Sequence, residues 1–396
     1  MEATCFIWQH HQLGLLLGLG QQASFCDSEK FDAKAFQDFL SQNSGNYIFG
    51  QLSFDVKNSF EELSSDNPDA LAFPVVNFWV PQSLYCLTTS PTLIWGSDSS
   101  QNQEQAAALF AAFKKKEGVL AAHFEPRTPK NAYFEHFEQL KSALQRGDIY
   151  EVNYCQEFAA QKCDINNPVG LFGRLYAETK APHAAYIQTA EHLVLCASPE
   201  RFLQKTGAVL RSEPIKGTAP RSKDPIEDQR LATELQNNPK ERAENIMIVD
   251  LVRNDLSQIA NKNSVGVEEL CQIYSFETVH QMISKISCTL DASVHFVDIL
   301  KACFPMGSMT GAPKIAALQQ IEKHEDFKRG LYSGSIGLIE PNGDFDLNVV
   351  IRSLLYNRKN QYLSCSVGSA LTIGANAEDE YQECLLKAEK LIHGLS

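Results

Sequence analysis

The strand-forming segments of this chain lie in two groups, residues 184–215 and 332–356, with no helix within either group, and this restricts the fold more than any other feature. They are rich in aliphatic and aromatic residues and lie at residues 184–189, 193–197, 202–215, 332–340 and 345–356. The last two flank the turn Pro-Asn-Gly-Asp at residues 341–344, and Asn-Gly in such a place is a strong hairpin signal. Strands joined by short turns run antiparallel. The sequence therefore predicts an α+β fold with antiparallel sheets, without repeated βαβ units.

Apolar residues recur at helical spacing in the segments around these strands. The expected helices are residues 104–116, 133–145, 171–179, 224–237, 239–256, 294–303, 314–324 and 379–393. Segment 124–130, Phe-Glu-Pro-Arg-Thr-Pro-Lys, has two prolines among charged residues and is typical of a linker. A chain of 396 residues is long enough for two domains. We therefore expect a short amino-terminal part, residues 1–125, packed on a larger catalytic domain, residues 126–396.

Composition and charge exclude several classes of protein. The formal net charge is −13 and the chain has no long block of Lys and Arg, so nucleic-acid binding is not expected. Residues 13–20 are apolar but far shorter than the roughly 20 residues that a membrane helix needs. The eleven cysteines are odd in number and form no Cys-x-x-Cys pair, which is typical of reduced thiols. We expect a cytoplasmic protein that binds neither membranes nor nucleic acid.

Residues 304–318 combine a small-residue turn with the start of a helix. Ser308 and Thr310 are suitable N-cap residues, and Pro313 suits a first helical turn. The free backbone N–H groups of such a turn, together with the charge of Lys314, would suit a carboxylate or phosphate. The alternative is an ordinary capped helix, which the turn by itself favours.

Two further motifs hold residue types that perform acid–base and nucleophilic chemistry. In Ser198-Pro-Glu-Arg-Phe, Glu200 is either a partly buried general acid or a surface carboxylate paired with Arg201. In Pro214-Ile-Lys-Gly-Thr, Lys216 follows an apolar segment and is either a desolvated nucleophile or one half of a salt bridge. Thr218 would hydrogen-bond a substrate or cap the turn.

Two pairs of glutamates lie three residues apart on expected helices. Glu241 and Glu244 form one pair, and Glu380 and Glu383 form the other, so each pair shares one helix face. Carboxylates from two helices can build an all-oxygen site for Mg²⁺, which holds few protein ligands and keeps bound waters. Either pair alone is more often a solvated helix face.

These motifs together resemble those of the chorismate-binding enzymes, the family that contains anthranilate, aminodeoxychorismate and isochorismate synthases. The resemblance also includes residues 147–158, Gly-Asp-Ile-Tyr-Glu-Val-Asn-Tyr-Cys-Gln-Glu-Phe, and extends over roughly residues 131 to 390 in the family's order. It implies the fold of anthranilate synthase component I, in which two antiparallel sheets stack between helices. It also implies chorismate as the substrate.

The resemblance assigns a role to each candidate residue. Glu200 would protonate the departing ring hydroxyl, and Lys216 would act as the nucleophile. For Mg²⁺, Glu244 and Glu383 would be direct ligands, with Glu241 and Glu380 acting through water. The residues assigned to chorismate binding are Thr218, Ser308, Thr310, Gly311, Lys314, Tyr332, Arg352, Gly368, Ser369 and Ala370.

Two positions favour one branch of the family. Lys216 matches the Pro-Ile-Lys-Gly-Thr of aminodeoxychorismate synthases, whereas anthranilate synthases usually have Ala there. Glu151 stands about where the isochorismate and salicylate branches carry a water-activating Lys, and this argues against water as nucleophile. The resemblance then implies replacement of the C4 hydroxyl of chorismate by ammonia, giving 4-amino-4-deoxychorismate for para-aminobenzoate and folate biosynthesis.

The chain has no Gly-x-Cys-x-Gly glutaminase motif, so ammonia is expected from a separate glutamine amidotransferase subunit. Three alternatives stay open. They are anthranilate synthase component I, an isochorismate or salicylate synthase, and a non-catalytic member of the family.

Overall fold

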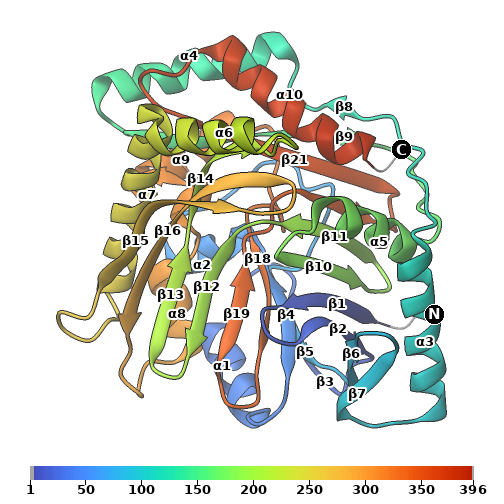
Figure 1. Cartoon of the computed structure of the whole chain (residues 1–396). Helices are drawn as coiled ribbons and strands as arrows, with labels where there is room; N and C mark the ends of the chain where they lie inside the picture. The colour runs from blue at the N-terminus through green and yellow to red at the C-terminus, as the bar shows by residue number, and fades with distance from the viewer. Residues whose placement is uncertain (1–3, 395–396) are drawn as a thin grey trace.

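The computed structural model describes residues 4–394 and shows two large sheets stacked face to face (Figure 1). Within the described residues one sheet has eleven strands and the other ten, and every pairing is antiparallel. The first sheet runs β17-β9-β21-β20-β11-β10-β1-β2-β6-β7, with β8 beside β9. The second runs β14-β16-β13-β12-β19-β18-β4-β5-β3, with β15 beside β16. The expected α+β fold with two stacked antiparallel sheets is confirmed.

The strands of the first sheet are β1 Cys5–His10, β2 Gly14–Leu19, β6 Ser83–Leu87, β7 Pro91–Gly96, β8 Glu125–Pro126, β9 Glu151–Ala160, β10 His183–Gln188, β11 His192–Ser198, β17 Gly311–Ala312, β20 Ser353–Asn357 and β21 Tyr362–Leu371. Those of the second are β3 Ala23–Asp27, β4 Ile48–Leu52, β5 Val76–Val80, β12 Arg201–Thr206, β13 Val209–Glu213, β14 Ile215–Pro220, β15 Gly266–Ser275, β16 Val279–Thr289, β18 Ser335–Ile339 and β19 Phe345–Asn348.

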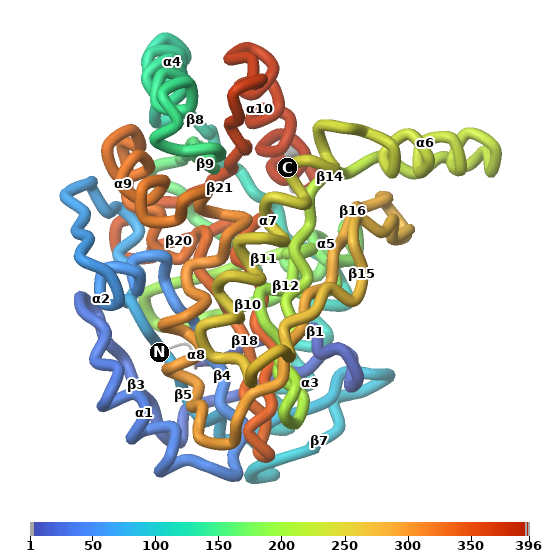
Figure 2. Tube along the Cα trace, turned by 90° about the vertical axis from the view of Figure 1, so that its left-hand side faces the viewer, coloured from blue at the N-terminus to red at the C-terminus, as the bar shows by residue number. Residues whose placement is uncertain are grey.

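The helices cover the outer faces and one end of the two sheets. They are α1 Ala33–Gln42, α2 Lys57–Phe60, α3 Ser100–Lys115, α4 Lys130–Arg146, α5 Pro168–Thr179, α6 Pro225–Asn237, α7 Pro239–Ser257, α8 Phe296–Cys303, α9 Lys314–His324 and α10 Ala377–His393, with short 3₁₀ turns η1 Phe54–Val56 and η2 Gly307–Met309. Helices α4 and α10 lie side by side at the same end in both views (Figures 1 and 2). Helix α7 packs on β14 and β16.

Strands β9, β10, β11 and β20 of the first sheet are buried on both faces, as expected for strands with long apolar stretches. In β10, Ala185 and Ile187 point into the core between the sheets, where Phe6 and Phe49 stack with ring centroids 3.7 Å apart. The alternate residues of β10 belong to a second core, formed with helices α3, α5 and α10. Each strand therefore contributes to two apolar layers.

The first 125 residues contribute strands to both sheets. Strand β1 pairs with β10, with Ile7 opposite Tyr186, and strand β4 pairs with β18, with Gly50 opposite Gly337. The proline-bounded segment near residue 125 forms β8, which pairs with β9. The strands that come first in the sequence therefore form one end of each sheet, and β1 and β4 join them to strands that come much later.

Several expected elements are present and two are divided differently. Helices α4, α7 and α10 match their predicted segments closely, and β18 and β19 form the predicted hairpin. The predicted strand 202–215 is wrong, because it is the hairpin β12–β13 followed by the start of β14. The predicted strand 345–356 is also wrong, because it breaks between β19 and β20 at Arg352, whose φ is +51°. Both breaks lie beside the candidate site.

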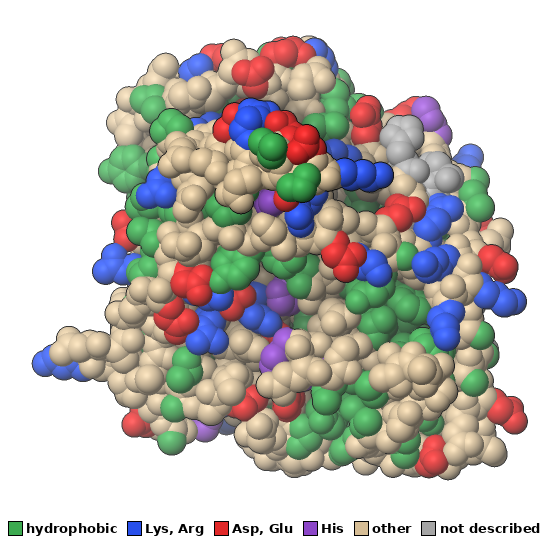
Figure 3. All heavy atoms as spheres, viewed as in Figure 1, with side chains coloured by type: hydrophobic (Ala, Val, Ile, Leu, Met, Phe, Trp, Pro, Cys, Tyr) green, Lys and Arg blue, Asp and Glu red, His purple; other side chains and the backbone are tan. Residues whose placement is uncertain are grey.

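The surface and the cysteines agree with the composition. Acidic and basic side chains are interspersed on the face shown in Figure 3. Over residues 4–394 no helix is both long and apolar enough to cross a bilayer. Within residues 4–394 no cysteine forms a disulfide, as predicted.

Candidate active site

A cleft of about 500 Å³ opens at the end of the sheets, between α7, α10, β14 and β21. Most of the predicted site residues line it, although they come from segments far apart in the sequence. They are Glu200, Lys216, Thr218, Glu241, Glu244, Ser308, Tyr332, Arg352, Gly368, Ala370, Glu380 and Glu383. The fold therefore brings the candidate nucleophile, the candidate acid and both glutamate pairs to one cavity.

Lys216 is the second residue of β14 and is largely buried at the wall of the cleft. Its Nζ donates a hydrogen bond of 2.8 Å to Oε1 of Glu151, on β9 of the other sheet. Burial by itself would lower the pKa of Lys216, but the charges of Glu151 and Glu244 outweigh it and raise that pKa above its usual value. Burial alone therefore does not free Lys216 of its proton in this structure.

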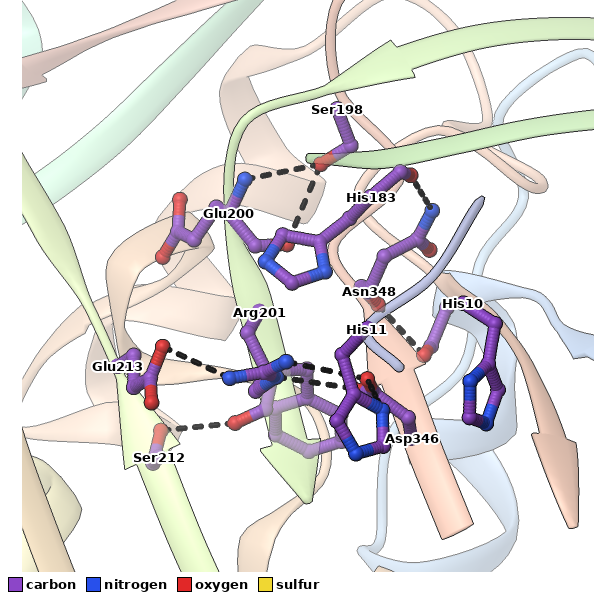
Figure 4. A network of polar contacts seen from close by, with 12 residues as sticks. His10, His11, His183, Ser198, Glu200, Arg201, Ser212, Glu213, Asp346 and Asn348 are labelled. Carbon is purple, nitrogen blue, oxygen red and sulfur yellow. Dashed lines mark hydrogen bonds and ion pairs between the residues drawn. The ribbon is translucent and has the colours of Figure 1, made fainter. Parts of the chain in front are cut away.

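Glu200 lies between β11 and β12 with its side chain buried in the cleft wall. Its backbone is held by Ser198, whose Oγ accepts a 3.2 Å hydrogen bond from the Glu200 N–H (Figure 4). Burial raises the pKa of Glu200 to about 7, and the Ser308 hydroxyl and the Lys216 charge only partly oppose this. At neutral pH the group can therefore carry the proton that a general acid needs.

The alternative for Glu200, a surface ion pair with Arg201, is excluded. The Arg201 guanidinium instead donates to Asp346 at 2.9 and 3.1 Å and to Glu213 at 3.0 Å (Figure 4). These partners hold β12 between β19 and β13, and Glu200 stays free to face the cleft.

The four glutamates of the two helices face each other across the cleft with lysines between them. Lys240 Nζ lies 3.2 Å from Glu380 Oε1 and 3.9 Å from Glu244 Oε1. Lys387 Nζ lies 2.6 Å from Glu383 Oε1 and donates to the carbonyl oxygen of Gly368 at 2.8 Å. In this arrangement ammonium groups partly neutralise the carboxylates.

The residues fit a magnesium ion by their chemistry. No group of three or more His, Cys, Asp or Glu side chains within residues 4–394 is close enough to enclose a metal, but Mg²⁺ commonly takes only one or two protein carboxylates. Glu244 Oε1 is buried and has no hydrogen-bond partner among the described residues. Burial raises the pKa of Glu244 to about 7, and a cation beside it would offset this cost.

Arg352 and Tyr332 form another part of the cleft wall. Arg352 lies in the break between β19 and β20, where its positive φ turns the chain. Burial lowers the pKa of its guanidinium, and no ion-pair partner for it is found over the described part of the chain. An unpaired, partly buried guanidinium suits a bidentate carboxylate ligand.

Two glycines allow close approaches at the site. A Cβ at Gly217, whose φ is +84°, would lie 3.0 Å from Glu241 Oε2, so only glycine brings β14 this close to α7. A Cβ at Gly311 would lie 2.1 Å from the Glu151 carbonyl oxygen. The 304–312 loop therefore packs directly on the first residues of β9.

Four predicted substrate-binding residues, Thr310, Gly311, Lys314 and Ser369, lie outside the cleft lining in this structure. Thr310 is buried, with its Oγ1 3.2 Å from the carbonyl oxygens of Met306 and Gly307, and Gly311 pairs with Val152 in the sheet. Lys314 Nζ lies 2.6 Å from Asp255 Oδ2. Ser369 is buried between two cleft residues of β21, on the opposite face of the strand.

The predicted N-caps are also wrong. Helix α9 begins at Lys314, with Pro313 before it and no side-chain cap, while Ser308 lies in the 3₁₀ turn η2. Ser308 nevertheless lines the cleft.

Some residues of the site were given no role from the sequence. Glu151 is the partner of Lys216, Lys240 and Lys387 lie between the glutamates, and Asn153 and Gln281 line the cleft. Helical spacing does signal Lys240 and Lys387, since each lies four residues from a predicted metal ligand. The contact of Glu151 with Lys216 joins different sheets and has no local sequence signal.

Arg329 was also missed, and it holds three segments of the site together. Its guanidinium is fully buried, pairs with Glu325 at 2.6 Å, and donates to the carbonyl oxygens of Met309 and Asn153. Glu325 in turn accepts from the backbone N–H of Cys155 at 2.9 Å. This buried pair fixes β9 against the 304–312 loop.

Comparisons with known proteins agree with this geometry. A sequence model described as chorismate binding enzyme matches residues 7–393. The chain is 37% identical to aminodeoxychorismate synthase component 1 of Klebsiella aerogenes over 293 residues, covering 74% of this chain and 63% of that one. It is 36% identical to the Escherichia coli K12 protein of the same name over 277 residues, covering 70% and 60%.

The chain thus spans about three fifths of the length of these curated relatives. Among solved structures, anthranilate synthase component I from Streptococcus pneumoniae TIGR4 superposes with a TM-score of 0.80 at 23% identity, covering 95% of this chain and 91% of that one. That similarity shows the anthranilate synthase component I fold.

Proposed function

Because the chain belongs to the chorismate-binding enzyme family, we propose that it aminates chorismate at C4 as an aminodeoxychorismate synthase component 1. The observation that carries this proposal is the position of Lys216, whose Nζ lies in the wall of the cleft beside the candidate acid Glu200. The similarity to two relatives of that name supports it. The product, 4-amino-4-deoxychorismate, would supply para-aminobenzoate and folate biosynthesis.

Chorismate carries two carboxylates, and the cleft offers cationic and polar groups for them. Arg352 would bind one carboxylate through its two parallel N–H donors, with Tyr332 beside it. The backbone of Gly368 and Ala370 forms the facing wall, on β21. These contacts would place the ring between β14 and β21, with C2 toward Lys216.

The reaction then uses two side chains. The neutral amine of Lys216 adds to C2, the ring double bonds shift, and the C4 hydroxyl leaves as water with the proton of Glu200. Ammonia adds to C4, the double bonds shift back, and the C2–N bond breaks to release Lys216. The aminated product returns a proton to the Glu200 carboxylate, so the enzyme is restored.

Glu244 and Glu383 would hold Mg²⁺ directly, and Glu241 and Glu380 would hold it through water. When bound, the ion supplies positive charge that neutralises the ring carboxylate. The side chains of Lys240 and Lys387 would have to move aside, and the Lys240 side chain is half exposed and so has room to do so.

Two other reactions of the family are disfavoured by particular residues. Anthranilate formation is the nearer one, because the fold is that of anthranilate synthase component I, but Lys216 would have no use in it. Isochorismate formation requires an activated water at C2, a place that Lys216 occupies through its pairing with Glu151. The products differ in retained side chain and in nitrogen content, so product analysis separates the three reactions.

We also propose a cytoplasmic location. No cysteine within residues 4–394 forms a disulfide and nine are buried, as expected where thiols stay reduced.

The proposed function is tested by incubating the purified chain with chorismate, Mg²⁺ and ammonium. We expect 4-amino-4-deoxychorismate, identified by chromatography and mass spectrometry. With glutamine as the nitrogen source we expect product only after a glutamine amidotransferase is added, since the chain has no glutaminase motif. Anthranilate or isochorismate as the product would overturn the proposed function. Glutamine-dependent turnover by the chain alone would contradict the expected amidotransferase partner.

A magnesium requirement is the second expectation from this site. Glu383→Gln removes a proposed ligand and should raise the Mg²⁺ concentration for half-maximal activity by about tenfold or more, as losses at metal sites commonly do. Glu378→Gln is the matched control, because Glu378 lies on the same helix but is exposed and pairs with Lys130. Full activity of the wild-type chain in excess chelator would contradict the proposed magnesium site.

A further inference from the structure

The contact between Glu151 and Lys216 has a geometry that its role as an ion pair does not explain. Glu151 Oε1 accepts the 2.8 Å hydrogen bond from Lys216 Nζ, and the Glu151 side chain is only 1% exposed. Its second oxygen, Oε2, is buried and has no hydrogen-bond partner among the described residues. The carboxylate therefore has one donor, and that donor is the candidate nucleophile.

Glu151 is also fixed in place by the backbone around it. It is the first residue of β9, where it pairs with Ala312 of β17, and Gly311 packs against its carbonyl oxygen. A carboxylate held this firmly beside an amine is placed for proton transfer over a short, constant distance.

We propose that Glu151 takes the proton of Lys216, and so converts this lysine from a buried ammonium ion into the amine that attacks chorismate. The proposal rests on the function proposed above. Glu151 acts through Lys216 and does not itself touch the substrate.

Burial reduces the free-energy difference between the charged pair and the neutral pair that proton transfer forms. A charged pair buried without further hydrogen bonds carries a large desolvation cost that its mutual attraction offsets only in part, whereas the neutral pair carries a much smaller one. Oε2 is buried and accepts no hydrogen bond among the described residues, so Lys216 is the group placed to exchange a proton with this carboxylate. The charged groups that act on Lys216 are Glu151 on β9, Glu200 before β12, Glu244 on α7 and Glu383 on α10.

The step balances within the pair. The Nζ–H bond of Lys216 breaks as an O–H bond forms on Glu151 Oε1, giving a neutral amine and a neutral carboxylic acid. The amine then adds to C2 of chorismate. When ammonia at C4 later expels Lys216 as an amine, Glu151 returns the proton and both groups regain their charges.

The competing role for Glu151 is that of a charge anchor, and it predicts an effect of opposite sign. The Glu151 carboxylate raises the pKa of Lys216, so its removal would increase the fraction of neutral amine. Under the anchor role Glu151→Gln would therefore keep or increase kcat near pH 7 and move the acidic limb of the pH profile lower. Under our proposal the same variant loses kcat.

The experiment compares wild type with Glu151→Gln, which keeps the shape of the side chain, at constant free ammonia from pH 6 to 9. We expect kcat at pH 7 to fall about a hundredfold, the lower end of the usual contribution of a positioned base. The remaining kcat should rise with pH as hydroxide replaces the carboxylate. Chorismate Kd, measured by calorimetry, should change by no more than about twofold, and Glu151→Asp should restore part of kcat.

Glu157→Gln is the control for a merely structural effect. Glu157 lies on the same strand, is also buried, and pairs with Arg127 and Tyr362 away from the cleft. We expect this variant to lower the unfolding temperature without changing the pH profile. A second readout is the chorismate-derived adduct on the Lys216 peptide without ammonia, which should form more slowly in Glu151→Gln even if that variant is less stable.

The outcomes separate the two proposals. Wild-type amination with a Glu151→Gln kcat within threefold at pH 7, or an acidic limb moved lower, overturns the role of Glu151 alone. A wild-type chain that forms no 4-amino-4-deoxychorismate overturns the proposed function and this inference with it.

Discussion

Replacing Lys216 by alanine is expected to lower kcat for amination by about 10³-fold, equivalent to about 4 kcal/mol of transition-state stabilisation. The reason is that the C2 adduct can no longer form, so ammonia must displace the C4 hydroxyl directly. Because Lys216 would attack the ring carbon and would not bind a carboxylate, chorismate Kd should change much less than kcat. Rapid-quench kinetics with mass analysis of the Lys216 peptide measures both the rate and the adduct.

The variant also leaves Glu151 buried without a cation, and this must be separated from the loss of chemistry. Breaking a buried pair typically costs about 3–5 kcal/mol of folding stability. The double variant Lys216→Ala/Glu151→Gln removes both charges, so it should regain stability but not activity. Lys285→Ala is the control on the neighbouring strand β16, where Lys285 pairs with Glu269 at the surface. Near-normal kcat in Lys216→Ala, with no adduct in wild type, would contradict the role of Lys216 as the nucleophile.

Replacing Glu200 by glutamine is expected to lower kcat by about 10²- to 10⁴-fold, because the C4 oxygen then leaves without a proton donor. The pH profile gives the more specific result. Burial raises the pKa of Glu200 to about 7, so the acid is protonated below that pH and loses its proton above it. Wild-type kcat/KM at constant free ammonia should therefore fall above about pH 7, and Glu200→Gln should lack this limb.

Asp255→Asn is a suitable control for this assignment. Burial also raises the pKa of Asp255, to about 6, but its carboxylate pairs with Lys314 behind the cleft wall. We expect that variant to be less stable and to keep the descending limb near pH 7. A limb that persists in Glu200→Gln would assign the acid to another group.

The sequence predicted the fold well where the signals are local. The Asn-Gly turn specified the β18–β19 hairpin, and apolar spacing specified α4, α7 and α10. It failed for residues 202–215, where the two-residue turn at residues 207–208, which begins at Gly207 with a φ of +58°, was overlooked between β12 and β13. The order of the strands could not be predicted from the sequence, because that order depends on pairings such as β4 with β18, which no local pattern encodes.

The site was predicted only as far as its motifs reach. Glu200, Lys216 and the helix glutamates line one cleft, and each was assigned its role because its motif resembles one of the chorismate-binding enzymes. Lys314 was assigned to the substrate because of its charge at a helix start, whereas the structure gives it Asp255 as a partner. The carboxylate that pairs with a lysine is chosen by tertiary contacts, which a local sequence pattern does not show. The pairing of Glu151 with Lys216 is another example.

The pairing of early strands with strands made much later has a consequence for synthesis on the ribosome. Strand β4 pairs with β18, which is made roughly 300 residues later, an interval of tens of seconds at ~5–20 residues per second. Until then the nascent chain holds apolar strands such as β4 with an open hydrogen-bonding edge, the kind of surface on which chains associate. We expect slow, highly cooperative folding late in translation, and a marked gain in recovered protein when holdase chaperones are abundant.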